Sequence, residues 1–311
     1  MPQRARSAAR RGRLAAAASG ICFGALGIFA QVAYRDGADI LGLLPLRFLV
    51  AGSVLALAAT LCGESWPSRR RVVACLALGG AGYLSFTFLF FTTLRHASPG
   101  VAVLLLYLNP FVVFAWSVAL RRERFRIGAL LLLAVAVAGL ALVLIDGSAS
   151  RTGVVLGAVT ALGYGTYLVL GADALADLPP LAATALVCLG AGAVALAAAA
   201  ALGGALPRTA AGWQALAGMT VVSTVLALGL LTVALQRIAP AEVATIMMVE
   251  PVFAVLLSAA VLDQAVTARQ AIGAAITLVA CTLFLRRRRD APPGAVTPRA
   301  GAASSPGRTG R

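Results

Sequence analysis

The chain has 311 residues, of which 60% are hydrophobic and 12% are charged, and its formal net charge at pH 7 is +15. A soluble fold of this size has too little interior for so many apolar side chains, so the composition excludes an ordinary soluble domain and indicates a polytopic membrane protein. All 26 basic residues are arginines that gather at the ends of apolar runs and in both tails. A nucleic-acid partner would need them along one exposed face, so we expect none.

Side chains that usually hold metals or act as nucleophiles are scarce. His96 is the single histidine. The cysteines lie singly in or beside apolar segments, at Cys22, Cys62, Cys75, Cys188 and Cys281. We therefore expect no metal, no disulfide framework and no cofactor. Because the chain has no lysine, it also cannot form a Walker-type phosphate loop.

Ten apolar runs follow one another along the chain, each close to the 20 or so residues that a helix needs to cross a bilayer core about 30 Å thick. The first follows a basic head but is too long for a typical signal-peptide core, so we predict an uncleaved first span. The expected spans are 14–34, 40–62, 72–94, 100–120, 127–145, 153–171, 181–203, 213–235, 241–262 and 268–285.

The arginines divide unequally between the two sides of the membrane. With the N terminus inside, 20 fall on the cytoplasmic side and five on the other, while Arg47 lies within the second span. The positive-inside rule then predicts a multi-pass plasma-membrane protein with both termini cytoplasmic. Residues 1–13 form a basic cytoplasmic tail. Residues 286–311, rich in Pro, Gly, Ala and Ser, are predicted to be a basic disordered tail whose arginines contact anionic lipid.

A pair of prolines occurs twice at the same spacing. Pro99 opens one apolar run and Pro110 interrupts it, and 141 residues later Pro240 and Pro251 do the same. This repetition divides the spans into two groups of five. Because five is odd, the second group enters the membrane from the opposite side, so we predict an all-α integral membrane fold of ten transmembrane helices arranged as two inverted five-helix repeats. The repeats comprise residues 14–145 and 153–285.

Each internal proline follows a polar residue near the middle of its span. Asn109 and Glu250 both lie about 14 Å from the start of their helices, which places them near the bilayer midplane. Each following proline lacks an N–H donor and frees the carbonyl four residues earlier, at Leu106 or Met247. Such a carbonyl is costly in lipid unless it is hydrogen-bonded or lines a wet cavity.

These features resemble the drug/metabolite transporter superfamily, and within it the EamA type, over residues 14–285. In that family a small residue and a proline precede the repeated span, a second proline lies within it, and a glutamate follows thirteen residues later. The first half has Ser98-Pro99, Pro110 and Glu123; the second has Ala239-Pro240 and Glu250-Pro251, but then Gln264 beside Asp263. The resemblance implies secondary transport by alternating access.

Three polar residues inside spans are candidate substrate or coupling residues. A carboxyl group at the depth of Glu250 costs about 2.5–3.5 kcal/mol to insert, so it normally faces a cavity or a partner. It is either a proton site or substrate contact, or a structural group that holds a bent helix. Arg47 either attracts a carboxylate, pairs with an acid from another span, or snorkels to the interface. Asn109 either lines a pocket or caps the bend at Pro110.

Aromatic residues supply candidate walls for an organic solute, and they are Tyr83, Phe86, Tyr107, Trp116, Tyr164 and Tyr167. Each alone is also compatible with packing. Glu123 and Glu242 are predicted to be solvated charges at helix ends. The glycines Gly20, Gly24, Gly27, Gly79, Gly80, Gly82, Gly163 and Gly165 are predicted to permit close approach of helices.

The sequence thus favours a secondary active transporter that exports or exchanges small organic metabolites or amphiphilic drugs, with Glu250 as the candidate site of proton coupling. Its expected partners are a small-molecule solute and membrane lipid. The alternative is an integral membrane enzyme acting on lipid-linked substrates, although no cluster of acids, histidines or lysines at one membrane face supports it. A non-catalytic scaffold or sensor would leave the inverted duplication unexplained.

Overall fold

The computed structural model describes residues 2–144, 149–262 and 266–289. Within these ranges the regular structure is helical, apart from one isolated β-bridge between Ala97 and Ala149. Asp263, Gln264 and residues 290–311 of the predicted disordered tail lie outside the described residues. Residues 286–289, the start of that predicted tail, are instead helical and end the helix Ala268–Arg289.

Ten helical segments of the described chain are long and apolar enough to cross a membrane, which confirms the predicted number. Five spans, the second, fifth, sixth, seventh and tenth, are single helices. They are α3 (Ile40–Leu61), α8 (Ile127–Leu144), α9 (Arg151–Ala174), α10 (Pro180–Leu202) and α15 (Ala268–Arg289).

The other five spans are interrupted. The first consists of α1 (Pro2–Gly24) and α2 (Leu26–Arg35), so its helix begins well before the predicted residue 14. The third and eighth each contain a π-helix, and the fourth and ninth are broken near their prolines. Their parts are α4 (Arg69–Ala77), η1 (Leu78–Tyr83) and α5 (Leu84–Thr93); α6 (Pro99–Leu106) and α7 (Asn109–Ala119); α11 (Ala210–Thr220), η2 (Val221–Leu226) and α12 (Ala227–Arg237); and α13 (Pro240–Met247) and α14 (Val249–Leu262).

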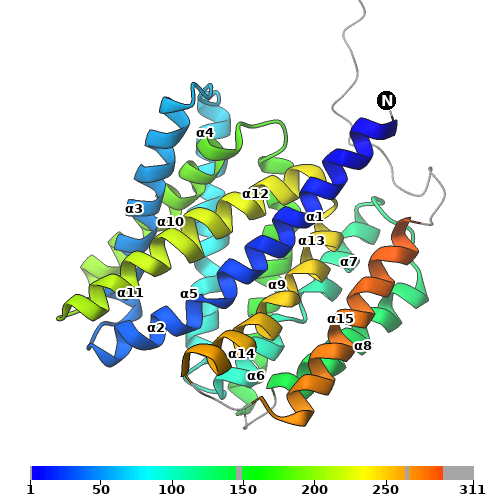
Figure 1. Ribbon diagram of the computed structural model, residues 1–311. Coiled ribbons are helices and arrows are strands. Elements are labelled where there is room, and N and C mark those ends of the chain that lie inside the picture. The colour runs from blue at the N-terminus through cyan, green and yellow to red at the C-terminus, as the bar shows by residue number, and fades with distance from the viewer. Residues whose placement is uncertain (1, 145–148, 263–265, 290–311) are drawn as a thin grey trace, which may run out of the picture.

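The main helix contacts between the two halves are symmetric: each contact has a counterpart in which the two halves have exchanged roles. α3 packs along α10 and α8 along α15, joining the second span to the seventh and the fifth to the tenth. Likewise α1 packs on α12 as α5 packs on α9, joining the first span to the eighth and the third to the sixth. Figure 1 shows α3 and α10 at one edge of the bundle and α8 and α15 at the other. This pairing is what two inverted five-helix repeats require.

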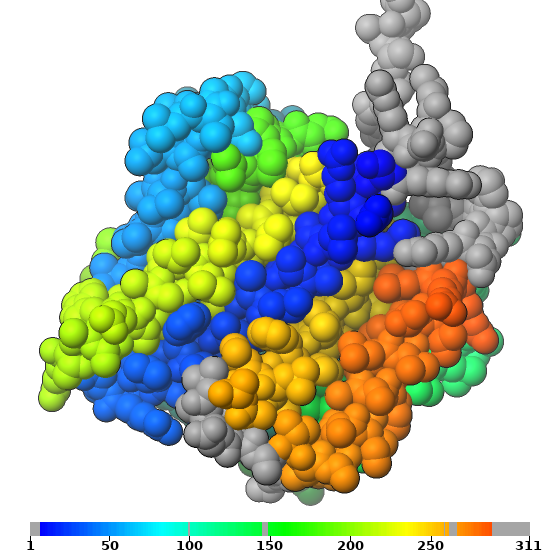
Figure 2. Space-filling model, in the orientation of Figure 1, coloured from blue at the N-terminus to red at the C-terminus, as the bar shows by residue number. Residues whose placement is uncertain are grey.

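Small residues allow the helices to approach closely. A Cβ added at Gly139 of α8 would lie 2.8 Å from the carbonyl oxygen of Gly273 in α15. A Cβ at Gly79 would collide with the Val187 carbonyl of α10, and one at Gly190 with the Leu76 carbonyl of α4. In a membrane, where lipid is as apolar as the side chains, such backbone contact supplies much of the packing energy. Figure 2 shows the resulting close packing of α1 across α12 and α14.

Candidate functional site

The fourth and ninth spans are each split into two half-helices at the predicted place. α6 ends at Leu106 and α7 begins at Asn109, while α13 ends at Met247 and α14 begins at Val249. The break arises because Pro110 and Pro251 cannot donate the backbone hydrogen bond that would continue the helix. Pro99 and Pro240 instead open their helices, where a missing N–H has no cost.

Both carbonyls that the prolines free have a side-chain donor. The Asn109 Nδ2 atom donates to the Leu106 carbonyl at 2.9 Å, within the same span. The Tyr107 hydroxyl donates to the Met247 carbonyl at 3.3 Å, across to the other half of the chain. Asn109 therefore caps its own bend, one of its two predicted roles. A residue of the first break also satisfies the second break.

Asn109 retains unused hydrogen-bonding capacity. Its side chain is 1% exposed, and its Oδ1 atom is buried without a hydrogen-bond partner in the described residues. Buried polar atoms normally have a partner, because leaving one unsatisfied costs about 1–3 kcal/mol. The Oδ1 atom is therefore an available acceptor beside the first break.

Glu250 lies in the first turn of α14, half-buried. A carboxylate there interacts favourably with the positive end of the helix dipole. The Tyr107 hydroxyl also interacts electrostatically with the Glu250 side chain. On the other side, α1 approaches so closely that a Cβ added at Gly24 would lie 3.0 Å from the Glu250 carbonyl oxygen. Tyr107 thus donates to the Met247 carbonyl and also interacts with the Glu250 carboxyl group, and both belong to the second break.

Four aromatic rings from the third and sixth spans form what we call the aromatic cluster. Tyr83 lies 5.0 Å from Phe86 and 5.3 Å from Tyr167, measured between ring centroids. Phe86 lies 4.8 Å from Tyr164. Tyr83 and Tyr164 both interact electrostatically with Glu250. The structure therefore brings Tyr107 and Tyr164 near the acid, and Tyr167 stacks on Tyr164.

Trp116 does not join this group. Its side chain is 40% exposed, and its indole nitrogen donates to the Thr166 hydroxyl at 3.1 Å. The ring lies at the outer surface of the bundle, where tryptophans with one wet and one apolar side are common in membrane proteins.

Arg47 is buried, with 3% of its surface exposed, so the prediction that it snorkels to the interface is wrong. Its Nε atom donates to the Thr224 hydroxyl at 2.6 Å and its Nη2 atom to the Ser223 carbonyl at 3.0 Å. Its guanidinium also interacts electrostatically with the Tyr83 side chain. Neither of the two ion pairs found among the described residues includes Arg47.

The two π-helices meet at this arginine. η2 supplies Ser223 and Thr224, to which Arg47 is hydrogen-bonded, and η1 ends with Tyr83, with which Arg47 interacts electrostatically. They occupy equivalent places in the third and eighth spans, and π-helices are frequent at functional sites. Sequence reasoning missed them. η1 has the sequence LGGAGY and η2 has VVSTVL, so no shared residue pattern could have indicated both.

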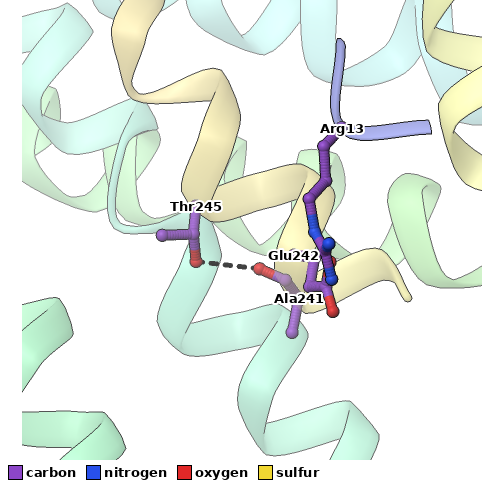
Figure 3. Close-up of polar contacts among 4 residues, drawn as sticks. All are labelled: Arg13, Ala241, Glu242 and Thr245. Carbon is purple, nitrogen blue, oxygen red and sulfur yellow. Dashed lines mark hydrogen bonds and ion pairs between the residues drawn. The ribbon is translucent and has the colours of Figure 1, made fainter. Parts of the chain in front are cut away.

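An ion pair joins the halves near the start of α1. The Arg13 Nε atom lies 3.0 Å from the Glu242 Oε2 atom, and the two side chains are 23% and 15% exposed. Figure 3 shows this contact at the first turn of α13, where the Thr245 hydroxyl donates to the Ala241 carbonyl at 2.8 Å. Glu242 is therefore paired and largely buried, which corrects the prediction of a solvated charge. The reason is that α1 extends beyond the predicted span and carries Arg13 to it.

A second acid joins the halves at the opposite end of the bundle. The Asp36 carboxylate accepts hydrogen bonds from the backbone N–H groups of Arg208 and Thr209, at 2.7 and 2.8 Å. These bonds, chiefly the one from Thr209, hold the pKa of Asp36 below its usual value. Asp36 thereby fixes the loop after α2 to the start of α11.

Among the described residues, no group of three or more metal-ligating side chains is found. The second break carries a carboxyl group with tyrosines around it, and the first break carries an amide oxygen that has no partner among the described residues. Such a set suits a polar organic solute or a proton, because it offers acceptors and aromatic surface in an apolar setting.

Comparison with known proteins gives two findings. Residues 10–145 and 151–286 each match the EamA-like transporter family. A solved structure titled "Crystal structure of protein" superposes with a TM-score of 0.77, covering 90% of this chain and 99% of that chain at 19% identity, which shows a shared fold. No curated protein matches the sequence.

Proposed function

Because the chain belongs to the EamA-like transporter family, we propose that it is a secondary active transporter that exports or exchanges a small organic metabolite or amphiphilic drug across the plasma membrane. The observation that carries this proposal is the pair of broken spans at equivalent places in inverted halves, bridged by Tyr107. Alternating access needs a central site whose walls belong to both halves and can separate. The arginine distribution supports cytoplasmic placement of both termini.

In this proposal Glu250 is the coupling group. Its carboxyl group lies at the start of a half-helix and beside Tyr107, so a proton or a substrate amine would compete for the same acceptor. The Asn109 Oδ1 atom offers a second acceptor, and Tyr164 and Tyr167 supply aromatic walls. Arg47 supports the site through Tyr83.

The test is solute flux into proteoliposomes under an imposed pH gradient, with a pooled mixture of metabolites and amphiphilic cations. Wild type should move at least one solute faster when the gradient is imposed. Glu250→Gln should keep solute exchange but lose the response to the gradient, because an amide cannot titrate. Glu64→Gln makes the same chemical change outside the predicted spans, and its amide oxygen can still accept from the Ala182 N–H, so this variant should behave as wild type.

If Glu250→Gln keeps the full gradient response, Glu250 is not the coupling site. If detergent-solubilised wild type instead converts a lipid-linked substrate without any gradient, the protein is an enzyme and the transport proposal is wrong.

A further inference from the structure

A long apolar groove runs along the lipid-facing surface between the third and sixth spans. Its volume is about 800 Å³. It extends on one wall from Ala74 in α4 to Leu89 in α5, and on the other from Asp173 to Val159 in α9. Fifteen residues of helix correspond to about 22 Å, which exceeds the roughly 15 Å of one leaflet of the hydrocarbon core. Figure 1 shows α5 and α9, the neighbours that frame it.

Two glycines line the groove, and their lack of side chains leaves room in it. A Cβ added at Gly82 would meet only side-chain atoms, of Tyr167 at 3.4 Å and Leu78 at 3.5 Å. At Gly163 the nearest atom would be the Phe86 Cβ at 3.1 Å. Gly79, by contrast, faces the Val187 backbone. The prediction that glycines of this region permit close helix approach therefore fails for Gly82.

The floor and one end of the groove differ in chemistry. Tyr167 and Phe86, two members of the aromatic cluster, line it from within. At the Asp173 end, the Arg122 Nη2 atom pairs with the Asp173 Oδ2 atom at 2.5 Å, and the Arg71 Nη1 atom donates to the Ala174 carbonyl at 3.3 Å. Two arginines against one acid leave this end with a net positive charge. Each guanidinium has five N–H donors and uses one of them in its bond to α9, so other donors remain for a ligand.

We propose that this groove binds an anionic glycerophospholipid, with one acyl chain along the glycine-lined floor and the phosphate between Arg71 and Arg122. Arginines at an anionic membrane surface favour acidic lipids, and the apolar walls favour a chain over a polar solute. A transmembrane helix 10–12 Å wide and 22 Å long would fill about 2,000 Å³, so the groove is too small to hold one. The lipid then lies one side chain away from Tyr164.

Trp116 provides a built-in reporter, because its indole bonds Thr166, which lines the groove. The other two tryptophans, Trp66 and Trp213, can be replaced by phenylalanine to leave Trp116 as the sole emitter. The protein is placed in vesicles that mix phosphatidylglycerol and phosphatidylcholine, with bromine on the acyl chains of one lipid at a time. Quenching of Trp116 then measures which lipid occupies the groove.

We expect brominated phosphatidylglycerol to associate about fivefold more strongly than brominated phosphatidylcholine, the selectivity that one arginine confers at a membrane surface. Gly82→Leu, which fills the groove, should abolish this excess, and Gly163→Leu is a second variant with the same aim. Gly229→Leu is the matched control, because nothing lies within 4 Å of a Cβ there. Arg71→Gln and Arg122→Gln should bring the ratio toward one, and Arg95→Gln should not.

Equal quenching by the two brominated lipids would overturn the proposal, as would wild-type quenching in both groove-filling variants. Quenching that falls as the protein-to-lipid ratio rises would show that a second copy of the chain covers the groove, which also contradicts lipid binding. Size-exclusion elution and thermal unfolding of each variant establish that it is folded.

Discussion

The breaks in the fourth and ninth spans share a backbone device but differ in side-chain chemistry. At Pro110 the preceding Asn109 donates to the freed Leu106 carbonyl, so the first break is satisfied within its own span. At Pro251 the preceding residue is Glu250, and an ionised carboxylate has no hydrogen to donate. The Met247 carbonyl therefore depends on Tyr107 from the other half. The first break therefore satisfies its freed carbonyl with a residue of its own span, whereas the second break needs a residue of the other half. The second break is also the one that carries an ionisable residue, Glu250.

The largest effect should come from giving the first break the chemistry of the second. Asn109→Asp removes the donor to Leu106 and places a carboxyl group where the side chain is 1% exposed. We expect a loss of about 3 kcal/mol or more in the free energy of unfolding, from the unsatisfied carbonyl and the buried charge together. Thermal unfolding in detergent micelles measures it. The converse change, Glu250→Gln, should leave the unfolding temperature near that of wild type. If the two variants lose the same free energy of unfolding, the two breaks do not differ in the way described.

A smaller effect is expected from Tyr107→Phe, which deletes the hydroxyl that reaches the second break. The Met247 carbonyl then lacks its donor, at a cost of about 1–3 kcal/mol in the free energy of unfolding. Tyr167→Phe is the matched control, because the structure assigns that hydroxyl no hydrogen bond within the described residues. Should both variants unfold at the same temperature, Tyr107 does not support the second break.

The start of the ninth span provides a third contrast. Glu242 in the first turn of α13 pairs with Arg13, whereas α6 has no acidic residue in its first turn. Because both side chains remain partly exposed, Glu242→Gln should lower the free energy of unfolding by no more than about 1 kcal/mol. The loss should shrink as salt is raised from low to molar concentration. A loss that is large and independent of salt would mean that Glu242 acts through something other than its ion pair.

The smallest expected effect lies at the far end of the bundle, where Asp36 joins the halves without contacting either break. Its pKa is lowered in the folded protein, so its contribution to stability is complete above the unfolded pKa near 3.8 and is lost as the pH falls through the folded value. Asp36→Asn should therefore lower the unfolding temperature slightly at neutral pH and not at the lowest pH tolerated. An equal change at both pH values would assign Asp36 a role unrelated to its charge.

The sequence was sufficient for features that depend on local chemistry. Apolar runs predict spans, an odd number of spans in each repeat predicts inversion, and a proline without an N–H predicts both the break and the carbonyl that it frees. It was insufficient where the outcome depends on which distant segments meet. The burial of Arg47 between two π-helices requires the third and eighth spans to converge. The sequences of η1 and η2 share no pattern that could have predicted this. The bond from Tyr107 to Met247 likewise exists because inversion places one break beside the other.

If the two breaks act as one site through Tyr107, gradient-driven solute flux in proteoliposomes will depend on Tyr107 and Glu250 together. The proteins to compare are wild type, Tyr107→Phe, Glu250→Gln and the double variant. Interacting residues give non-additive changes. Our account predicts that the double variant is no slower than the slower single variant, because both substitutions disable the same unit. If the two losses instead multiply, Tyr107 and Glu250 act independently and the breaks do not form a single site.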